Sequence, residues 1–295
     1  IRNESVEALF VPSARSIRSA RGRNGGRVRD DRVAVSAAPS AEQRLEGDGV
    51  SYDGDVPLVG IDDRRRVALV GGLLIDESYE QGEGFGADTS GYGNFPFLTN
   101  LIDHLSETDG DVILAGGQGQ FNAEGSLSLE DCKYYLRYLE GVDARLRQIN
   151  DLERTLPDES EPPRAVLLSA PARELEFGEL LALREYRNEG GAVVLLGSAA
   201  ADADHTRNLN RLAARLETDL RFNEDRIVDA ERNLADDPAV LETVAFNDSF
   251  PLFEASDPSD RTDEDDEADE APGNSDHARG HRETGPGNSG NAPGR

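Results

Sequence analysis

Residues 190–197 read GGAVVLLG and give the strongest structural signal in the chain. The segment from Ala192 to Leu196 is apolar at every position, with glycines on both sides. A strand that is apolar on both faces is typical of a parallel sheet covered by helices on both sides. Shorter runs of the same type occur at 67–70 (VALV), 112–114 (VIL) and 165–168 (AVLL). We therefore predict that these segments are buried strands of one sheet.

Helical patterns alternate with these apolar runs. Apolar residues recur three and four positions apart in 97–105, 129–139, 177–183 and 209–216. Strands that alternate with amphipathic helices are typical of a sheet with helices packed against it. The sequence therefore predicts an α/β fold with an open, mostly parallel sheet and helices on both faces.

Both ends of the chain differ in composition from the part between them. Between Asp260 and Glu270, eight of eleven residues are acidic, and such a segment has too little apolar surface to offset the entropy cost of ordering it. We predict a disordered Arg-rich linker or upstream remnant over 1–48, an α/β domain over 49–253 and an acidic disordered tail over 254–295. The chain begins with Ile1, so we expect a longer protein whose start is missing.

The N-terminal zone is basic although the chain as a whole is acidic. We expect it to be a linker, with an electrostatic tether to the protein's own acidic surface or to an anionic partner as the alternative. Its basic stretch contains Arg15, Arg18, Arg21, Arg23, Arg27 and Arg29.

The charge balance predicts a protein from a halophilic archaeon. The formal net charge is −28, and Lys133 is the single lysine among 31 basic residues. In about 1 M salt the Debye length is only about 3 Å, so repulsion is screened while hydrated carboxylates keep the protein soluble. Acidity then reflects the solvent, and high salt makes a nucleic-acid surface unlikely to be useful. Both the cytoplasm and the cell surface remain open as locations.

The cysteine count and hydropathy exclude two further classes. Cys132 is the single cysteine, so no intrachain disulfide is possible, and no run of about 18 apolar residues predicts a membrane span. Because Cys132 lies on the apolar side of its helical pattern, we expect it to be packed in the core and not to act as a nucleophile.

The first candidate site is the loop that follows the strand at 112–114. Residues 116–122 read GGQGQFN, and their glycines permit a tight turn at the carboxyl end of a strand. Gln118, Gln120 and Asn122 could present amides to a ligand. Alternatively, the loop is a simple strand-to-helix connection whose amides are solvated or bridge to a neighbouring loop.

The second candidate site follows the strand at 192–196. Ser198 stands where an α/β enzyme could place a nucleophile or a ligand contact, but the G-x-S-x-G elbow is absent. Asp202, Asp204 and His205 could ligate a divalent metal. Asp204 is also suited to cap the next helix, and we favour that role.

Other motifs carry no chemistry that we can assign. Residues 82–87 (GEGFGA) match a dinucleotide fingerprint, but acidic neighbours and the lack of a strand-to-helix context argue against it. His277 and His281 fall in the predicted tail, which leaves His104 and His205 as histidines of the domain. No Cys/His spacing resembles a zinc site, and we predict no cofactor.

Several stretches resemble an uncharacterised domain family of halophilic archaea, often found in larger proteins and related to the class I glutamine amidotransferase-like, flavodoxin-like fold. The resemblance implies the same α/β fold. Active amidotransferases carry a nucleophilic Cys at an elbow after a strand, with a His partner. Here the chain has AGGQ after Leu114 and GSA after Leu196, and we expect His to be common where Gln118 stands. The matching runs are 49–62 (GVSYDGDVPLVGID), 92–100 (YGNFPFLTN), 116–122 (GGQGQFN), 190–197 (GGAVVLLG), 208–210 (NLN) and 220–229 (LRFNEDRIVD).

These observations favour a non-catalytic α/β module of a larger halophilic protein, which binds a ligand or a neighbouring domain. The ligand-binding residues would be Gln118, Gln120, Asn122 and Ser198. The alternative is a metal-assisted hydrolase that uses Ser198, Asp202, Asp204 and His205. A second alternative is a nucleic-acid accessory module that acts through the Arg-rich N-terminal zone.

Overall fold

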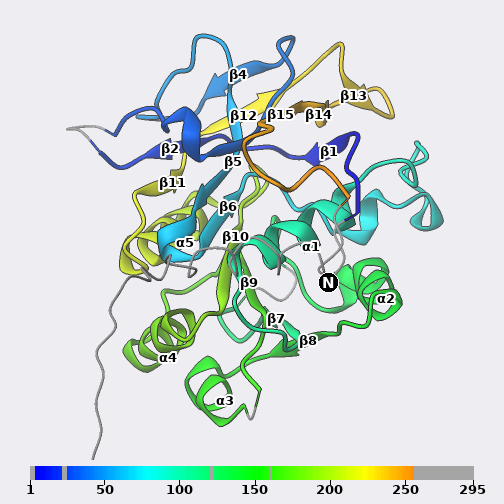
Figure 1. The fold of residues 1–295 in the computed structure, drawn as a ribbon. Coiled ribbons are helices and arrows are strands. Elements are labelled where there is room, and N and C mark those ends of the chain that lie inside the picture. Colours follow the sequence, from blue (N-terminus) through cyan, green and yellow to red (C-terminus); the bar gives the residue numbers. More distant parts are fainter. Residues whose placement is uncertain (1–3, 22–24, 120–122, 160, 256–295) are drawn as a thin grey trace, which may run out of the picture. The chain divides into compact units, whose positions relative to one another are not determined.

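The computed structural model describes residues 4–21, 25–119, 123–159 and 161–255. Within these residues an eight-stranded sheet forms in the order β15-β3-β5-β6-β10-β9-β7-β8 (Figure 1). Along this order, β6, β10, β9, β7 and β8 are parallel to one another. The pairs β15–β3, β3–β5 and β5–β6 are antiparallel. The prediction of an α/β fold with a mainly parallel sheet is confirmed. In sheet order, the strands are Ala245–Phe246, Val33–Ser36, Pro57–Asp62, Val67–Val70, Ala192–Leu196, Ala165–Ser169, Val112–Ala115 and Leu146–Ile149.

Helices cover both faces of the parallel strands, as predicted. Val193 and Leu195 of β10 pack in the cluster that contains residues of α3, α4 and α5, whereas Val194 packs with residues of α1 and α2. Figure 1 shows α1 and α2 on one side of these strands and α4 and α5 on the other. The helices are α1 (Asn94–Leu105), α2 (Lys133–Gly141), α3 (Leu152–Asp158), α4 (Phe177–Asn188) and α5 (Ala203–Arg215).

The connections between the parallel strands change direction at one place in the sheet. β7 connects through α2 to β8 on one side, whereas β9 connects through α4 to β10 on the other side. Because the chain leaves the neighbouring strands β7 and β9 in opposite directions, their carboxyl ends form a topological switch point. Ligands of open α/β sheets bind at such a point, so the loops after β7, β8 and β9 are the first place to look for a site.

The prediction of a disordered linker over residues 1–48 is wrong for the described part of that segment. Leu9, Ala14 and Ile17 are fully buried, and the segment belongs to the same compact unit as the rest of the fold. Each of its strands pairs with a strand from the C-terminal part of the domain. These pairs join β1 (Leu9–Pro12) to β14 (Asp237–Thr243), β2 (Ile17–Ser19) to β11 (Leu220–Phe222), β3 to β15, and β4 (Glu42–Leu45) to β12 (Asp225–Val228).

Short elements complete the described part of the chain. The segment at 82–87 begins inside a 3₁₀ turn and does not lead from a strand into a helix, in agreement with its rejection as a dinucleotide site. Of the predicted tail over 254–295, only Glu254 and Ala255 are described. Among the described residues, no helix has the length and apolar character needed to cross a bilayer. The short elements are β13 (Asn233–Leu234) and 3₁₀ turns at Asp30–Arg32, Asp63–Arg65, Glu77–Tyr79, Gln81–Glu83 and Glu130–Cys132.

Candidate binding site at the carboxyl ends of β7 and β8

The chain's own N-terminal segment covers one half of the carboxyl edge of the sheet. The backbone N–H of Arg15 donates to the carbonyl of Gly71, directly after β6, at 2.8 Å. The backbone N–H of Ala199, after β10, donates to the carbonyl of Ser13 at 2.7 Å. A Cβ atom at position 71 would lie 2.0 Å from the Arg15 carbonyl oxygen, so the close approach requires glycine there. The ends of β6 and β10 are therefore occupied.

Ser198 lies beneath this segment and does not line an open site. Its exposed fraction is 2 %, and its carbonyl accepts a hydrogen bond from Nε of Arg15 at 3.3 Å. Its hydroxyl oxygen accepts from the backbone N–H of Ala200 at 3.1 Å. The sequence placed Ser198 correctly after a strand, but it did not reveal that residues 13–15 cover it.

The other members of the predicted metal set do not converge. Asp202 is the N-cap residue of α5 without a side-chain capping bond, so the expected capping role of Asp204 is wrong. Asp204 instead forms an ion pair with Arg207, and Nδ1 of His205 is enclosed without a hydrogen-bond partner. Within the part of the chain that the structure describes, no three His, Cys, Asp or Glu side chains could hold a metal ion together.

Gln118 bridges two loops and does not face a ligand. The residue is fully buried, and its amide nitrogen donates to Oε1 of Glu179 at 3.0 Å. Its backbone carbonyl accepts from the backbone N–H groups of Ala172 and Arg173, in the loop after β9. This arrangement is the bridging alternative considered from the sequence. Gln120 and Asn122 lie outside the described residues.

An ion pair between Arg173 and Glu179 completes this bridge. Two guanidinium nitrogens of Arg173 each lie 2.8 Å from a Glu179 oxygen, and Glu179 also accepts from the backbone N–H of Glu176 at the start of α4. Burial alone would raise the pKa of Glu179, but its contacts with Arg173, Glu176 and Gln118 outweigh burial and lower it. The two charges therefore neutralise each other within the β9–α4 connection. The loop after β7 is joined to this pair by Gln118, through Glu179, and by the Gly117 carbonyl, which accepts from Nη2 of Arg173 at 3.3 Å.

An open hollow of about 360 Å³ remains beside this bridge, at the carboxyl ends of β7 and β8. Gly117 adopts a φ of +82°, which favours glycine, and a Cβ there would lie 2.1 Å from the carbonyl oxygen of Asn150. The glycines thus let the loop after β7 pass close to the loop after β8. The lining residues are Gly116, Gly117, Gly119, Leu127, Ser128, Gln148 and Asn150.

The hollow presents uncharged polar groups. Oε1 of Gln148 accepts from the backbone N–H of Leu129, and Nε2 of Gln148 donates to Oδ1 of Asn150, both at 2.9 Å. The amide nitrogen of Asn150 has no hydrogen-bond partner among the described residues, and the Asn150 side chain is exposed. A ligand with a hydrogen-bond acceptor could accept a hydrogen bond from this amide nitrogen.

Sequence reasoning missed Gln148 and Asn150 because it missed β8. The strand reads LRQI and has only two apolar residues, since it lies at the edge of the sheet and is buried less than β9 or β10. The only available signal was the position of this segment directly after the helical pattern that ends near residue 139.

Comparison with known proteins adds little to this picture. No protein-family model matches the chain, and no curated protein sequence matches it. Among solved structures, the chain aligns with IMPa from Pseudomonas aeruginosa in complex with an O-glycopeptide, with a TM-score of 0.35 and 11% sequence identity. The alignment covers 65% of this chain and 20% of that one, so the chain spans about a fifth of that protein's length. Similarity at this level identifies neither the fold family nor the site.

Proposed function

We propose that this chain is a non-catalytic ligand-binding α/β module, and that the hollow between the loops after β7 and β8 is its binding site. The observation that carries the proposal is that only one half of the sheet's carboxyl edge is covered by the chain itself. The chain itself covers the ends of β6 and β10, whereas a hollow remains open next to the switch point.

The state of the nucleophilic side chains supports a binding role. The hydroxyl of Ser198 is buried and engaged with backbone, and no histidine contacts it among the described residues. Burial raises the pKa of the Cys132 thiol well above its ordinary value, so the thiolate is disfavoured. His104 contacts Asp63 at 2.8 Å, and neither residue lines the hollow. Among the described residues, neither Ser198 nor Cys132 is paired with a histidine.

The chemistry of the hollow supports an uncharged, polar ligand. Every lining side chain is neutral, and the polar groups are two amides, glycine backbone and the Ser128 hydroxyl, which donates to Oδ2 of Asp131 at 2.8 Å. A ligand with hydroxyl or carbonyl groups can satisfy such donors without bringing charge into the site.

The strand order supports the relationship to the flavodoxin-like and class I amidotransferase-like folds that we propose from the sequence. Counted along the chain from β7, the parallel strands lie in the order 2-1-3-4, and β6 occupies the fifth position. The flavodoxin-like order is 2-1-3-4-5. In this chain the fifth strand comes from the N-terminal side. The halophilic origin is likewise our proposal, and it rests on composition alone.

The nucleic-acid alternative loses support because its arginines are already engaged. Arg15 is buried, and Arg21 pairs with Asp219 at 2.6 Å. Arg27 pairs with Asp53, and Arg29 pairs with Asp31. Arg23 lies outside the described residues, and Arg18 is treated below. The pairs of Arg21 and Arg27 join the segment to the rest of the domain, and we do not propose a nucleic-acid role.

The test is thermal unfolding of the full chain in about 1 M KCl, where charge repulsion is screened. Neutral sugars, N-acetylated amino-acid amides and their phosphorylated or carboxylated counterparts are added one at a time. A ligand at about 100 times its Kd should stabilise the protein by about 2.7 kcal/mol. We expect a shift with an uncharged compound that is lost in Asn150→Ala.

The matched control is Gln81→Ala, which removes an exposed amide outside the hollow. The control should keep the ligand shift of the wild type. A shift that survives in Asn150→Ala would place binding elsewhere, and no shift with any uncharged compound would contradict the proposal.

A further inference from the structure

Two antiparallel ribbons in this fold each place one arginine directly opposite another. In the β2–β11 ribbon, Arg18 is opposite Arg221. In the β4–β12 ribbon, Arg44 is opposite Arg226. Like charges that face each other across two strands are destabilising, so each pair needs negative charge nearby.

The β4–β12 ribbon supplies that negative charge itself. Arg44 lies 3.4 Å from a carboxylate oxygen of Glu42, and Arg226 lies 3.3 Å from one of Glu46. All four side chains are exposed. Each arginine of this ribbon therefore has its own carboxylate partner.

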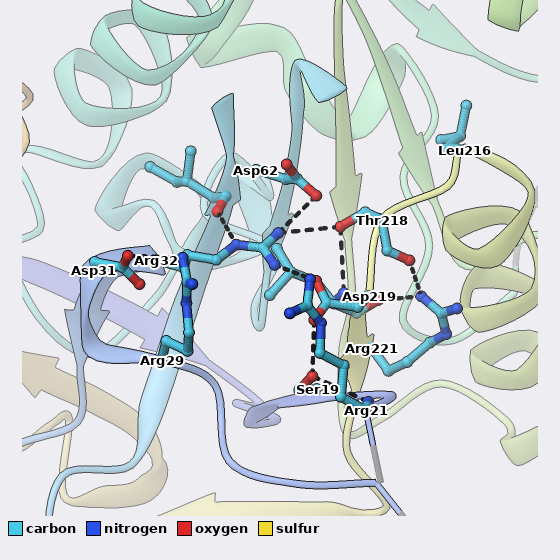
Figure 2. Close-up of polar contacts among 12 residues, drawn as sticks. Ser19, Arg21, Arg29, Asp31, Arg32, Asp62, Leu216, Thr218, Asp219 and Arg221 are labelled. Atoms are coloured by element: carbon cyan, nitrogen blue, oxygen red, sulfur yellow. Dashed lines mark hydrogen bonds and ion pairs between the residues drawn. The ribbon is translucent and has the colours of Figure 1, made fainter. Parts of the chain in front are cut away.

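The β2–β11 ribbon supplies no carboxylate partner for its two arginines among the described residues. Nη1 of Arg221 donates to the carbonyls of Thr218 and Leu220, at 2.7 and 2.6 Å, and both acceptors are neutral (Figure 2). Nε of Arg18 is enclosed without a hydrogen-bond partner. Within the described residues, neither arginine forms an ion pair with a carboxylate.

The carboxylate closest along the chain to Arg221 is already engaged. Asp219 forms ion pairs with Arg32 and Arg21 and accepts a hydrogen bond from the hydroxyl of Ser19 at 3.0 Å (Figure 2). Burial, followed by the charge of Arg18, lowers the pKa of the Arg221 guanidinium although Asp219 opposes this effect. The surroundings of Arg221 are therefore short of negative charge.

The backbone places both arginines on the same outer side of the ribbon. Ile17 and Ser19 flank Arg18 and are buried, and Leu220 and Phe222 flank Arg221 in the same way. Side chains alternate along a strand, so the two half-buried guanidinium groups emerge on the face opposite to these four residues. Gly25 lies against Arg18, since a Cβ there would be 2.6 Å from Nη1.

We propose that Arg18 and Arg221 form a binding site for a phosphate-type oxyanion. Nε of Arg18 is enclosed and Nη1 of Arg221 donates to two carbonyls, so the remaining guanidinium N–H groups would donate to the oxygens of a phosphate. The anion supplies the charge that the ribbon lacks. Free inorganic phosphate and the phosphoryl group of a larger molecule share this chemistry. The site is separate from the hollow after β7 and does not depend on the function proposed for it.

The test is a calorimetric titration of the full chain with inorganic phosphate at constant ionic strength. We expect the Kd for phosphate to rise at least about tenfold, which corresponds to about 1.4 kcal/mol, in Arg18→Gln and in Arg221→Gln. Arg18→Lys keeps the positive charge but loses the forked donor geometry, so its Kd should lie between those of the wild type and Arg18→Gln. Without phosphate, Arg18→Gln should raise Tm because it removes the repulsion, and this rise also shows that the variant folds.

The matched controls are Arg44→Gln and Arg226→Gln, which remove arginines in the same geometry that have carboxylate partners. Both should bind phosphate like the wild type. A parallel titration with a phosphate monoester tests the source of the anion, because a lower Kd than for inorganic phosphate indicates a larger ligand. The proposal fails if the wild type binds neither compound, or if the control variants weaken binding as much as Arg18→Gln.

Discussion

The parallel and antiparallel parts of the fold are stabilised in different ways. In the parallel part, β9 and β10 are buried at every position and pack on helices through apolar side chains. In the antiparallel part, short strands from the two ends of the domain meet around buried polar groups. From this difference we expect apolar burial to stabilise most of the parallel part, and buried polar contacts to contribute more to the pairing of the antiparallel part.

Asp225 is the centre of the polar contacts in the antiparallel part. The side chain is fully buried and accepts from the backbone N–H of Ser16 at 2.9 Å and from Nδ2 of Asn223, also at 2.9 Å. It further accepts from Nε2 of Gln43 at 2.6 Å and from the hydroxyl of Ser16. Ser16 and Asp225 are 209 residues apart along the chain. This one carboxylate therefore holds the start of β12 against β4 and against Ser16, which precedes β2.

Asp225→Ala should give the largest loss of stability. The change leaves several buried donors without an acceptor, and each such donor costs about 1–3 kcal/mol. We expect the free energy of unfolding to fall by about 4 kcal/mol in urea titrations followed by circular dichroism. Asp225→Asn keeps the shape and one acceptor and should lose less. A loss below about 1 kcal/mol in Asp225→Ala would contradict the claim that buried polar contacts stabilise the antiparallel part.

Leu195→Ala tests the parallel part and should give the next largest loss. Leu195 is fully buried on β10, and truncation of a core leucine costs about 3 kcal/mol because it removes buried methyl groups and leaves a cavity. The same urea titration measures the effect. The control is Phe177→Ala on α4, whose side chain is 81 % exposed and which should change stability by less than about 0.5 kcal/mol. Equal losses in the two variants would contradict the assigned packing.

Asp219 should give the smallest effect, and one that depends on pH. Burial would raise the pKa of Asp219, but the contacts with Arg32 and Ser19 outweigh burial and hold it below the ordinary value of 3.8. The carboxylate therefore stabilises the fold above about pH 4, and this contribution is lost as the pH falls through the lower, folded-state pKa. The difference in unfolding free energy between wild type and Asp219→Asn should be largest near neutral pH.

Urea titrations between about pH 7 and pH 3 follow this difference. Asp53→Asn is the control, because Asp53 pairs with Arg27 but is 95 % exposed, and exposed pairs contribute little. A difference for Asp219→Asn that stays constant down to pH 3 would show that its charge is not the stabilising feature.

The parts that the sequence predicted well are those that depend on local pattern. The buried strands at 67–70, 112–114 and 165–168 and the helices between them follow from the spacing of apolar residues, because one period fits a strand and another fits a helix. Burial of Cys132 followed from the same spacing. β8 was missed because an edge strand needs fewer apolar residues.

The candidate site could be predicted only in part. The sequence identified the loop after β7, where glycines at 116, 117 and 119 line the hollow. It selected Gln118 and Ser198 as ligand contacts, but both are buried by segments that are distant along the chain. Gln148 and Asn150 line the hollow without any distinctive motif.

By itself, the sequence determined that this protein has apolar parallel strands covered by helices on both faces, because that burial is encoded in each segment. Only the tertiary structure decided that residues 4–21 and 25–48 belong to the domain and which half of the carboxyl edge stays open. The physical reason is that the N-terminal strands pair through backbone hydrogen bonds and a few buried polar side chains. Their partners lie about 200 residues away, and no local pattern records such pairing.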